Sequence, residues 1–279
     1  MSVINTNKSA LLAANALITN ERVMQKTMRS LSTGSRINSS SDDAAGLSIR
    51  ENMTSQINGL NAAVRNANDA INLLQTTDAS MGSIGDMMQR MRELGTLAQN
   101  DTYSTAQKSS LNVEYQALLT QIGQVASNTQ WNKMGVLTGS GGEVGTAGIF
   151  SFQVGANASQ TITVTISDHR TTGSLASIAG TTVDTGTNAA TAVSALDSAL
   201  AVLNTNRGSI GAGINRLEHA INNLTNVAQN ATDSRSRVTD TDYSKATSDL
   251  ARQQIIQQAG TAMLAQANQQ PSTVLALLR

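Results

Sequence analysis

The sequence predicts a mainly α-helical protein: a long coiled-coil-like helical bundle with a small β-hairpin region and paired terminal helices. Apolar residues between Met53 and Met91 return alternately every four and three positions, and the segment from Leu196 to Ala231 repeats this spacing. An average spacing of 3.5 residues keeps one seam of a helix facing a partner helix. Aromatic residues make up only 2% of the chain, which favours thin bundles over a globular core with aromatic anchors.

The composition argues against several classes of function. The formal net charge is zero and 14% of residues are charged, so the electrostatic signature of a nucleic-acid-binding protein is absent. Cysteine is absent, which removes disulfides, thiolate metal sites and thiol nucleophiles. No apolar run approaches the ~18 residues of a membrane span, and the N-terminus lacks a secretory signal pattern. These signals alone predict a cytoplasmic protein without membrane insertion.

The first half of the chain reads as three helices. An amphipathic helix is expected over residues 3–31, with no partner nearby in sequence, and it should end at Gly34. A polar stretch then leads to an N-cap at Asp43 and a long helix from about Ala44 to about residue 100. A shorter helix over residues 105–127 supplies a third member of the bundle.

A change of composition after Trp131 predicts β-structure. Glycines crowd the stretch from Gly135 to Gly148, and apolar residues then alternate with polar ones on both sides of a short loop. The alternating positions are Phe150, Phe152 and Val154 before the loop, and Ile162, Val164 and Ile166 after it. This pattern predicts a β-hairpin with a loop of about five residues. Residues 171–191 have few apolar side chains, so we expect exposed turns or short strands there.

The second half returns to helices. A long helix is expected over residues 192–235, and its three interior glycines, Gly208, Gly211 and Gly213, suggest close approach of a neighbouring backbone. Asp240 to Asp242 should cap a last helix, which Pro271 is expected to break or kink. Both terminal helices carry apolar stripes that should pack on each other or on other subunits.

The pattern therefore predicts three kinds of region. They are a terminal-helix, coiled-coil domain of residues 1–35 and 243–279, linkers at 36–43 and 236–242, and a middle helical bundle domain at 44–235 that includes the β-hairpin and turn region 132–191.

No residue pattern predicts an enzyme, a cofactor site or a metal site. His169 and His219 are far apart and are expected at the surface. The glycines from Gly208 to Gly213 lie inside a helical repeat, without the preceding strand of a phosphate-binding loop. The acidic pairs lack the further ligands of a calcium loop and are better explained as helix caps. Arg207 is expected to be a paired or snorkelling arginine at a helix crossing.

Several segments resemble the bacterial flagellin family, in order along some 240 residues. The matching segments are Leu31–Asn38, Asp42–Leu47, Arg65–Asp69, Gln89–Leu94, Phe152–Asn157, Asn215–Arg216, Ser236–Tyr243 and Met263–Asn268. Three positions depart from the family pattern: Ser35 stands where the family usually has Leu, Trp131 where it has Phe, and Lys133 where it has Gly. The short insertion between the helical halves resembles a flagellin without large outer domains.

The resemblance implies a structural subunit that self-assembles into the helical, tubular filament of the bacterial flagellum and serves motility. It also implies a protein secreted through the flagellar export apparatus without a cleaved signal, hence an extracellular location in place of the cytoplasmic one. The implied partners are other copies of the chain, an export chaperone, the filament cap and hook–filament junction proteins.

Two sets of residues are candidates for these contacts. The terminal helices offer Leu11, Leu17, Met24, Leu31, Ile255, Ile256, Met263 and Leu264 for polymerisation. The family resemblance adds Arg90, Leu94 and Glu114, a surface buried between subunits and recognised on free flagellin monomers by an animal innate immune receptor. The segment Gly95–Leu97 departs from the receptor-active pattern.

Two other functions remain open at this point. A hook–filament junction protein shares the terminal helices, although the match from Phe152 to Asn157 favours flagellin. A coiled-coil signalling or secretion adaptor would instead form a dimer of fixed size. Electron microscopy of concentrated protein separates the adaptor, which gives discrete particles, from a flagellin, which gives long tubes.

Overall fold

The computed structural model describes residues 6–139 and 148–276, with side chains described as far as Gln269. The glycine run from Gly141 to Gly145 and the apolar ends of the chain, Val3, Ile4, Leu277 and Leu278, lie outside the described residues. The chain forms two compact units, which we name the terminal unit (Met1–Ser55 with Asn230–Arg279) and the middle unit (Gln56–Gln229). In the described ranges, no helix has the length and apolar character that crossing a bilayer requires.

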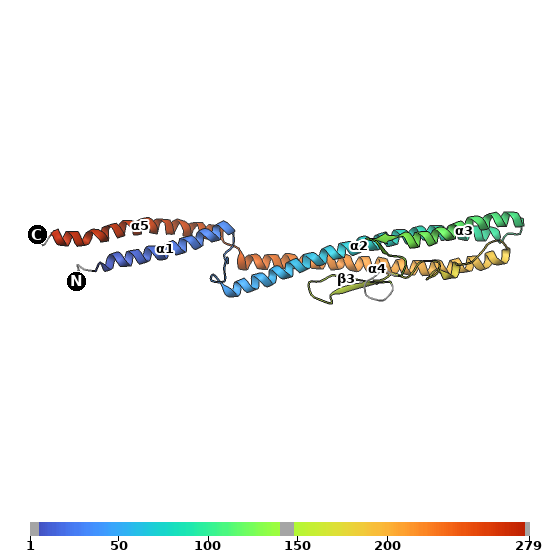
Figure 1. Ribbon diagram of the computed structural model, residues 1–279, viewed down its shortest axis with the longest axis horizontal. Helices are drawn as coiled ribbons and strands as arrows, with labels where there is room; N and C mark the ends of the chain where they lie inside the picture. Colours follow the sequence, from blue (N-terminus) through green and yellow to red (C-terminus); the bar gives the residue numbers. More distant parts are fainter. Residues whose placement is uncertain (1–5, 140–147, 277–279) are drawn as a thin grey trace. The chain divides into compact units, whose positions relative to one another are not determined.

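The terminal unit is built on two antiparallel helices that lie side by side, α1 (Lys8–Thr33) and α5 (Tyr243–Ala276) (Figure 1). It also holds the start of α2 (Ala44–Ala98) and the end of α4 (Gly186–Thr239). The expected linker at 236–242 is mostly helical, because α4 continues to Thr239. The two connecting segments are hydrogen-bonded to each other: the Arg36 amide donates to the Thr239 carbonyl (2.6 Å) and the Thr241 amide to the Gly34 carbonyl (2.9 Å).

Short polar side chains begin these helices where the sequence predicts caps. Asp43 Oδ1 accepts a hydrogen bond from the Gly46 amide (2.9 Å) at the start of α2. Asp242 Oδ1 accepts from the amides of Ser244 (3.0 Å) and Lys245 (3.1 Å) at the start of α5. These carboxylates satisfy amide groups that have no partner inside the helix, so the capping prediction is confirmed.

The middle unit is a bundle of α2, α4 and α3 (Thr105–Asn128), as the seam spacing predicts. Its core takes apolar side chains from all three helices: Leu74, Met81, Ile84, Met88 and Met91 of α2, Tyr115 and Ile122 of α3, and Leu196, Leu203, Ile210 and Leu217 of α4. Arg207, where the α4 seam is interrupted, pairs through Nε with Asp78 Oδ1 of α2 at 2.8 Å, which confirms a paired arginine.

Two hairpins complete the middle unit. The predicted one is formed by β3 (Ile149–Gln153) and β4 (Thr161–Thr165), with Ile162 and Val164 buried and the intervening threonines exposed. A second, short hairpin joins β1 (Gln130–Trp131) to β2 (Met134–Gly135). Its two turn residues, Asn132 and Lys133, both have positive φ angles, 47° and 66°. This left-handed conformation favours glycine, which the flagellin pattern has at the position of Lys133.

The expectation of exposed turns over residues 171–191 is wrong in part. The short 3-10 helix η1 (Ala176–Ile178) lies in this segment, and α4 begins at Gly186, six residues earlier than expected. Leu175, Ile178 and Val183 are fully buried. The segment is fixed to α3, because Gln116 Nε2 donates to the Thr181 carbonyl (2.7 Å). A few well-placed apolar side chains are therefore enough to bury a segment rich in Thr, Gly and Ser.

The α4 glycines do not share one explanation. A Cβ atom at Gly208 or Gly211 would have no neighbour within 4 Å, so the predicted close approach is wrong at both positions. A Cβ at Gly213 would lie 2.8 Å from Val164 Cγ2, a side-chain atom and not a backbone atom.

The break expected at Pro271 is also absent, since α5 continues to Ala276. Proline lacks an amide hydrogen and its ring crowds the carbonyl four residues earlier, yet the residues on both sides of Pro271 are helical.

His169 is fully buried, so the prediction of a surface position is wrong for this histidine, whereas His219 is exposed. His169 Nδ1 donates to the Ser167 carbonyl (2.6 Å), and His169 Nε2 accepts from Asn206 Nδ2 of α4 (3.1 Å). These two hydrogen bonds compensate for the loss of water around the imidazole. Burial lowers the pKa of His169, although its bond to Ser167 and the charge of Asp168 oppose this shift.

Candidate functional site

The first candidate site is the seam between α1 and α5. Half-buried or buried positions recur every three or four residues on both helices: Ala10, Ala13, Leu17, Asn20, Met24, Thr27 and Leu31 of α1, and Ala246, Leu250, Gln253, Gln257, Gly260, Leu264 and Ala267 of α5. Leu17 lies against Gly260, where a Cβ atom would meet Leu17 Cδ2 at 2.7 Å. The seam therefore has the spacing of a coiled coil, with a glycine of α5 packed against Leu17 of α1.

The eight candidate residues on the terminal helices fall into two groups. Leu17, Met24, Leu31 and Leu264 are half-buried in the described structure, whereas Leu11, Ile255, Ile256 and Met263 are exposed. The prediction that the two terminal helices pair is confirmed, because α5 covers one side of the α1 stripe. The two helices are separated by more than 200 residues, so the sequence did not show which residues of each stripe face the other helix.

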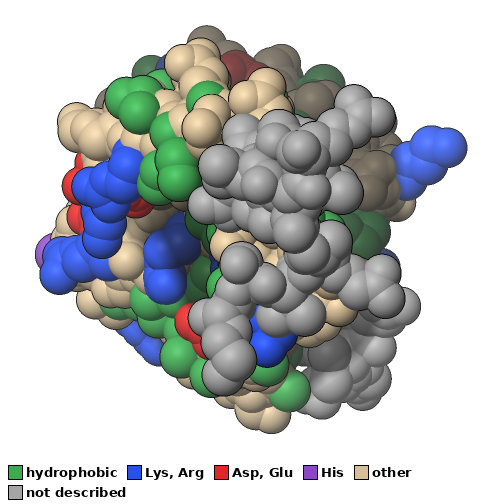
Figure 2. Space-filling model, turned by 90° about the vertical axis from the view of Figure 1, so that its left-hand side faces the viewer, with side chains coloured by type: hydrophobic (Ala, Val, Ile, Leu, Met, Phe, Trp, Pro, Cys, Tyr) green, Lys and Arg blue, Asp and Glu red, His purple; other side chains and the backbone are tan. Residues whose placement is uncertain are grey.

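A substantial apolar surface remains on α1 and α5 after they pair. The exposed fractions are 57% for Leu11, 66% for Ile255 and 65% for Met263. Leu12 (71%) and Met28 (53%) of α1 are exposed as well, although they are not among the residues predicted from the sequence. In the space-filling view of Figure 2, hydrophobic side chains stand among polar ones on the described surface that faces the viewer. No described side chain of α1 is fully buried, so one partner helix does not complete its packing.

Asp42 holds the connecting segment against α1. Its carboxylate accepts from Lys26 Nζ (3.0 Å) and from the amides of Asn38 (3.2 Å) and Ser39 (3.1 Å). The Lys26 hydrogen bond, followed by the bonds from Asn38 and Ser39, lowers the pKa of Asp42 to about 2, against a smaller opposing effect of desolvation. This cluster fixes the chain between α1 and α2.

The second candidate site lies on α2 and α3 in the middle unit. Arg90 Nε donates to Glu114 Oε1 (3.0 Å) and Arg90 Nη1 to Glu93 Oε2 (3.0 Å). The hydrogen bond with Glu114, more than that with Glu93, raises the pKa of Arg90. Leu94 does not share this surface, because its side chain is 1% exposed and belongs to the core of the unit. The exposed part of the predicted set is therefore Arg90 and Glu114.

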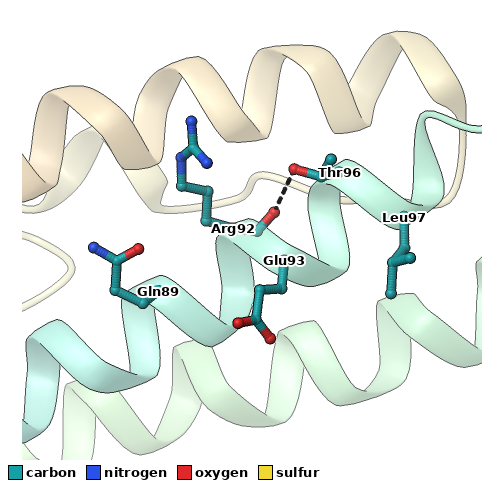
Figure 3. A pocket seen from close by; sticks show the side chains of 5 residues that line it. All are labelled: Gln89, Arg92, Glu93, Thr96 and Leu97. Atoms are coloured by element: carbon teal, nitrogen blue, oxygen red, sulfur yellow. Dashed lines mark hydrogen bonds between the residues drawn. The ribbon is translucent and has the colours of Figure 1, made fainter.

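A surface pocket adjoins this ion pair on α2 (Figure 3). It is lined by Gln89, Arg92, Glu93, Thr96 and Leu97. Arg92 Nε also donates to Asp197 Oδ1 of α4 (2.6 Å), so charged side chains connect α2 to both neighbouring helices. Among the described residues, no cluster of histidine and acidic side chains has the arrangement of a metal site. The features at both sites suit contact between proteins.

Comparison with known protein families shows to which family the chain belongs. Residues 4–141 match the bacterial flagellin N-terminal helical region, and residues 193–278 match the bacterial flagellin C-terminal helical region. The chain belongs to the bacterial flagellin family. Relatives of this flagellin include a flagellin of Halalkalibacterium halodurans, 38% identical over 99% of this chain and 100% of the relative. Another is the flagellar filament 33 kDa core protein of Treponema phagedenis, 37% identical over 99% of this chain and 100% of the relative.

A solved structure supports the same assignment. The crystal structure of Bacillus cereus flagellin is 30% identical and aligns with a TM-score of 0.50, covering 57% of this chain and 88% of that one. This flagellin is therefore a structural subunit of the flagellar filament and not an enzyme, and it self-assembles into that extracellular filament. The interpretation as a flagellin is confirmed, and the alternatives of a junction protein or an adaptor are not favoured.

The α1–α5 seam also contains a polar layer, which the spacing of apolar residues alone does not reveal. Asn20 Nδ2 donates to the Gln253 carbonyl (2.9 Å) and to Gln257 Oε1 (3.3 Å). The spacing of the apolar residues on α5 contained the signal, because Gln253 and Gln257 occupy seam positions between Leu250 and Leu264. A search for apolar stripes passes over amides at such positions.

Proposed function

We propose that this flagellin polymerises through the exposed apolar side chains of α1 and α5, of which Leu11, Ile255, Ile256 and Met263 are the central members. Leu17, Met24, Leu31 and Leu264 serve a different role, which is to hold the two helices together. The exposure of the first group supports this division. Burial of each such side chain between subunits contributes about 1.5 to 3 kcal/mol, so a few of them suffice to favour assembly.

We also propose a division of labour along the chain. Residues 1–35 and 243–279 act as the inner polymerisation domain, residues 36–43 and 236–242 as linkers, and residues 44–235 as the middle bundle domain. The two compact units support this division, although their bounds lie 6 to 20 residues away from the proposed ones.

The polymerisation surface can be tested with two matched variants on α5. Met263→Asp places a carboxylate at an exposed apolar position, whereas Gln266→Asp places it at an exposed polar position on the same helix. Seeded elongation, followed by light scattering and electron microscopy, should fall more than about tenfold for Met263→Asp, because an unpaired charge would be buried between subunits. The Gln266→Asp chain should elongate normally. Normal elongation of the Met263→Asp chain would contradict the proposal.

Arg90 and Glu114 are proposed to lie in a second contact between subunits. Both side chains are about half exposed and already paired, so a neighbouring copy meets an ordered, neutralised surface. Arg90→Ala should slow seeded elongation, and Arg65→Ala, an exposed arginine on the same helix, is the matched control. Equal elongation of the two variants would contradict a role for the Arg90 surface.

The same surface of the free monomer is proposed to bind an animal innate immune receptor. The exposed ion pair and the adjoining pocket of Arg92 and Thr96 support this second role. Binding of a purified receptor ectodomain to the monomer, compared between Arg90→Ala and Arg65→Ala, tests it. No difference between these variants would exclude Arg90 from receptor binding.

Further partners follow from the exposed stripe of α5. Apolar side chains such as Ile255 and Met263 would promote aggregation before secretion, so we infer an export chaperone that covers α5 inside the cell. The chain is then proposed to be secreted through the flagellar export apparatus and to assemble between the hook–filament junction proteins and the filament cap. At equal concentration, the wild-type chain should aggregate more than the Met263→Asp chain, because the variant has one exposed apolar side chain fewer on α5.

A further inference from the structure

The most buried large side chain in the α1–α5 seam is polar. Among the described residues of these two helices, the buried side chains are Ala246 and Gln253, and Gln253 is 9% exposed. Its Oε1 atom is buried, and no donor in the described part of the chain reaches it. An apolar side chain of similar size would avoid this unsatisfied acceptor. The glutamine therefore lowers the stability of the seam and requires another explanation.

Asn20 of α1 lies beside Gln253 and completes a polar layer across the seam. Its Nδ2 group donates to the Gln253 carbonyl (2.9 Å) and to Gln257 Oε1 (3.3 Å). Gln257 is half-buried, as is Asn20. One amide group thus contacts the partner helix at two successive seam positions, which ties it to a particular place along α5.

A slip of the two helices by one heptad would remove the side-chain acceptor of Asn20. A slip of one heptad in either direction would replace Gln257 with Leu250 or Leu264 as the residue opposite Asn20. The Asn20 side chain would then face a leucine and lose its side-chain acceptor. The apolar seam residues by themselves do not discriminate in this way, because leucine can pack against leucine in several registers.

We propose that Asn20, Gln253 and Gln257 form a register-selecting layer, which holds the two terminal helices of one chain in a single alignment. A slip of seven residues would displace one helix by about 10.5 Å at ~1.5 Å per residue. The exposed side chains of α1, such as Leu11, would then be shifted along the seam relative to the exposed side chains of α5, such as Met263. The link to assembly rests on the proposed polymerisation surface, whereas register selection itself does not.

Engineered cysteine pairs can report the register, because the natural chain contains no cysteine. Leu17→Cys with Gly260→Cys reports the observed alignment, since these residues are in contact. Leu17→Cys with Ala267→Cys reports a slip of one heptad. Each pair is placed in three full-length backgrounds: the natural seam, a seam with Asn20→Leu, Gln253→Leu and Gln257→Leu, and a control with Gln254→Leu, which is exposed on the same helix.

Monomers are oxidised slowly with a glutathione buffer, and the two disulfide yields are compared. The natural and Gln254→Leu chains should form almost only the 17–260 disulfide. In the triple-leucine chain, the yield of the 17–267 disulfide should rise about tenfold or more, as the penalty against the slipped register disappears. A triple-leucine chain that keeps only the 17–260 disulfide would overturn the proposal. Equal yields of both disulfides in the natural chain would also overturn it.

Seeded elongation of the same backgrounds without cysteines separates this inference from the proposed function. The triple-leucine chain should slip and elongate poorly, while the Gln254→Leu chain elongates normally. Slippage with normal elongation would support register selection and refute the alignment-dependent polymerisation surface. Poor elongation without slippage would refute register selection but would not contradict the proposed polymerisation surface.

Discussion

Replacing Gly208 or Gly211 with alanine should stabilise the middle unit, and the same replacement at Gly213 should destabilise it. All three glycines lie within α4, where glycine costs about 0.5–1 kcal/mol relative to alanine. A methyl group at Gly208 or Gly211 meets no atom within 4 Å, so the full gain in helix propensity is expected. For a unit of this size, a gain of ~1 kcal/mol raises the melting temperature by about 2–4 °C.

At Gly213 the same replacement with alanine should lower stability instead of raising it. A Cβ atom there would lie 2.8 Å from Val164 Cγ2 and 3.6 Å from Leu74 Cδ1. Val164 is buried on β4 and cannot withdraw without disturbing the hairpin. Overpacking of this kind costs ~1–3 kcal/mol, which outweighs the gain in helix propensity, so a net loss of about 1 kcal/mol is expected.

Urea unfolding of the monomer, followed by far-UV circular dichroism, measures all three variants. Gly180→Ala is the matched control, because this glycine also has open space around it but adopts a φ of 73°. Alanine is strained in that conformation, so Gly180→Ala should lower stability although nothing obstructs its methyl group. Unchanged or lowered stability for both Gly208→Ala and Gly211→Ala would refute the reasoning from helix propensity and open space.

Three further results are expected. Lys133→Gly should raise the free energy of unfolding by about 1 kcal/mol, since it relieves a positive φ in the β1–β2 turn; urea unfolding without a gain would contradict this. The pKa of His169 is lowered in the folded protein, so the stability that this histidine contributes is present above its ordinary pKa and is lost as the pH falls below that value. His169→Gln should therefore flatten the dependence of the unfolding free energy on acid pH. An unchanged pH profile would exclude His169 as the source of that dependence. Lys26→Gln should raise the pKa of Asp42 from about 2 toward its ordinary 3.8, and NMR titration showing no rise would exclude the Lys26 hydrogen bond as the cause.

The sequence alone determined the helices and the predicted hairpin. Their signals are local: the seam spacing between Met53 and Met91, the alternation around Ile162 and Val164, and the carboxylates at Asp43 and Asp242 act within a few residues of chain. Each of these predictions is confirmed. The family pattern is equally local, which is why its segments could be recognised without the fold.

Tertiary structure decided which apolar side chains are covered. Leu11 and Leu17 have the same chemistry and lie on the same helix, yet only Leu17 packs against Gly260 of a helix far away in sequence. Periodicity shows that a stripe needs a partner, but it does not show which partner supplies the contact or how much of the stripe that partner covers. The division between seam and assembly surface therefore had to come from the structure.

The same limit explains His169 and Leu175, which the sequence placed at the surface and the structure buries. Their flanking residues are mostly Thr, Gly and Ser, so local composition favours exposure. Burial depends instead on Asn206 of α4 for the histidine, and on packing in the middle core for the leucine. The sequence by itself determined which segments become helices or strands, because those signals are local. Only the three-dimensional packing decided which side chains remain exposed, because that depends on residues distant in the chain.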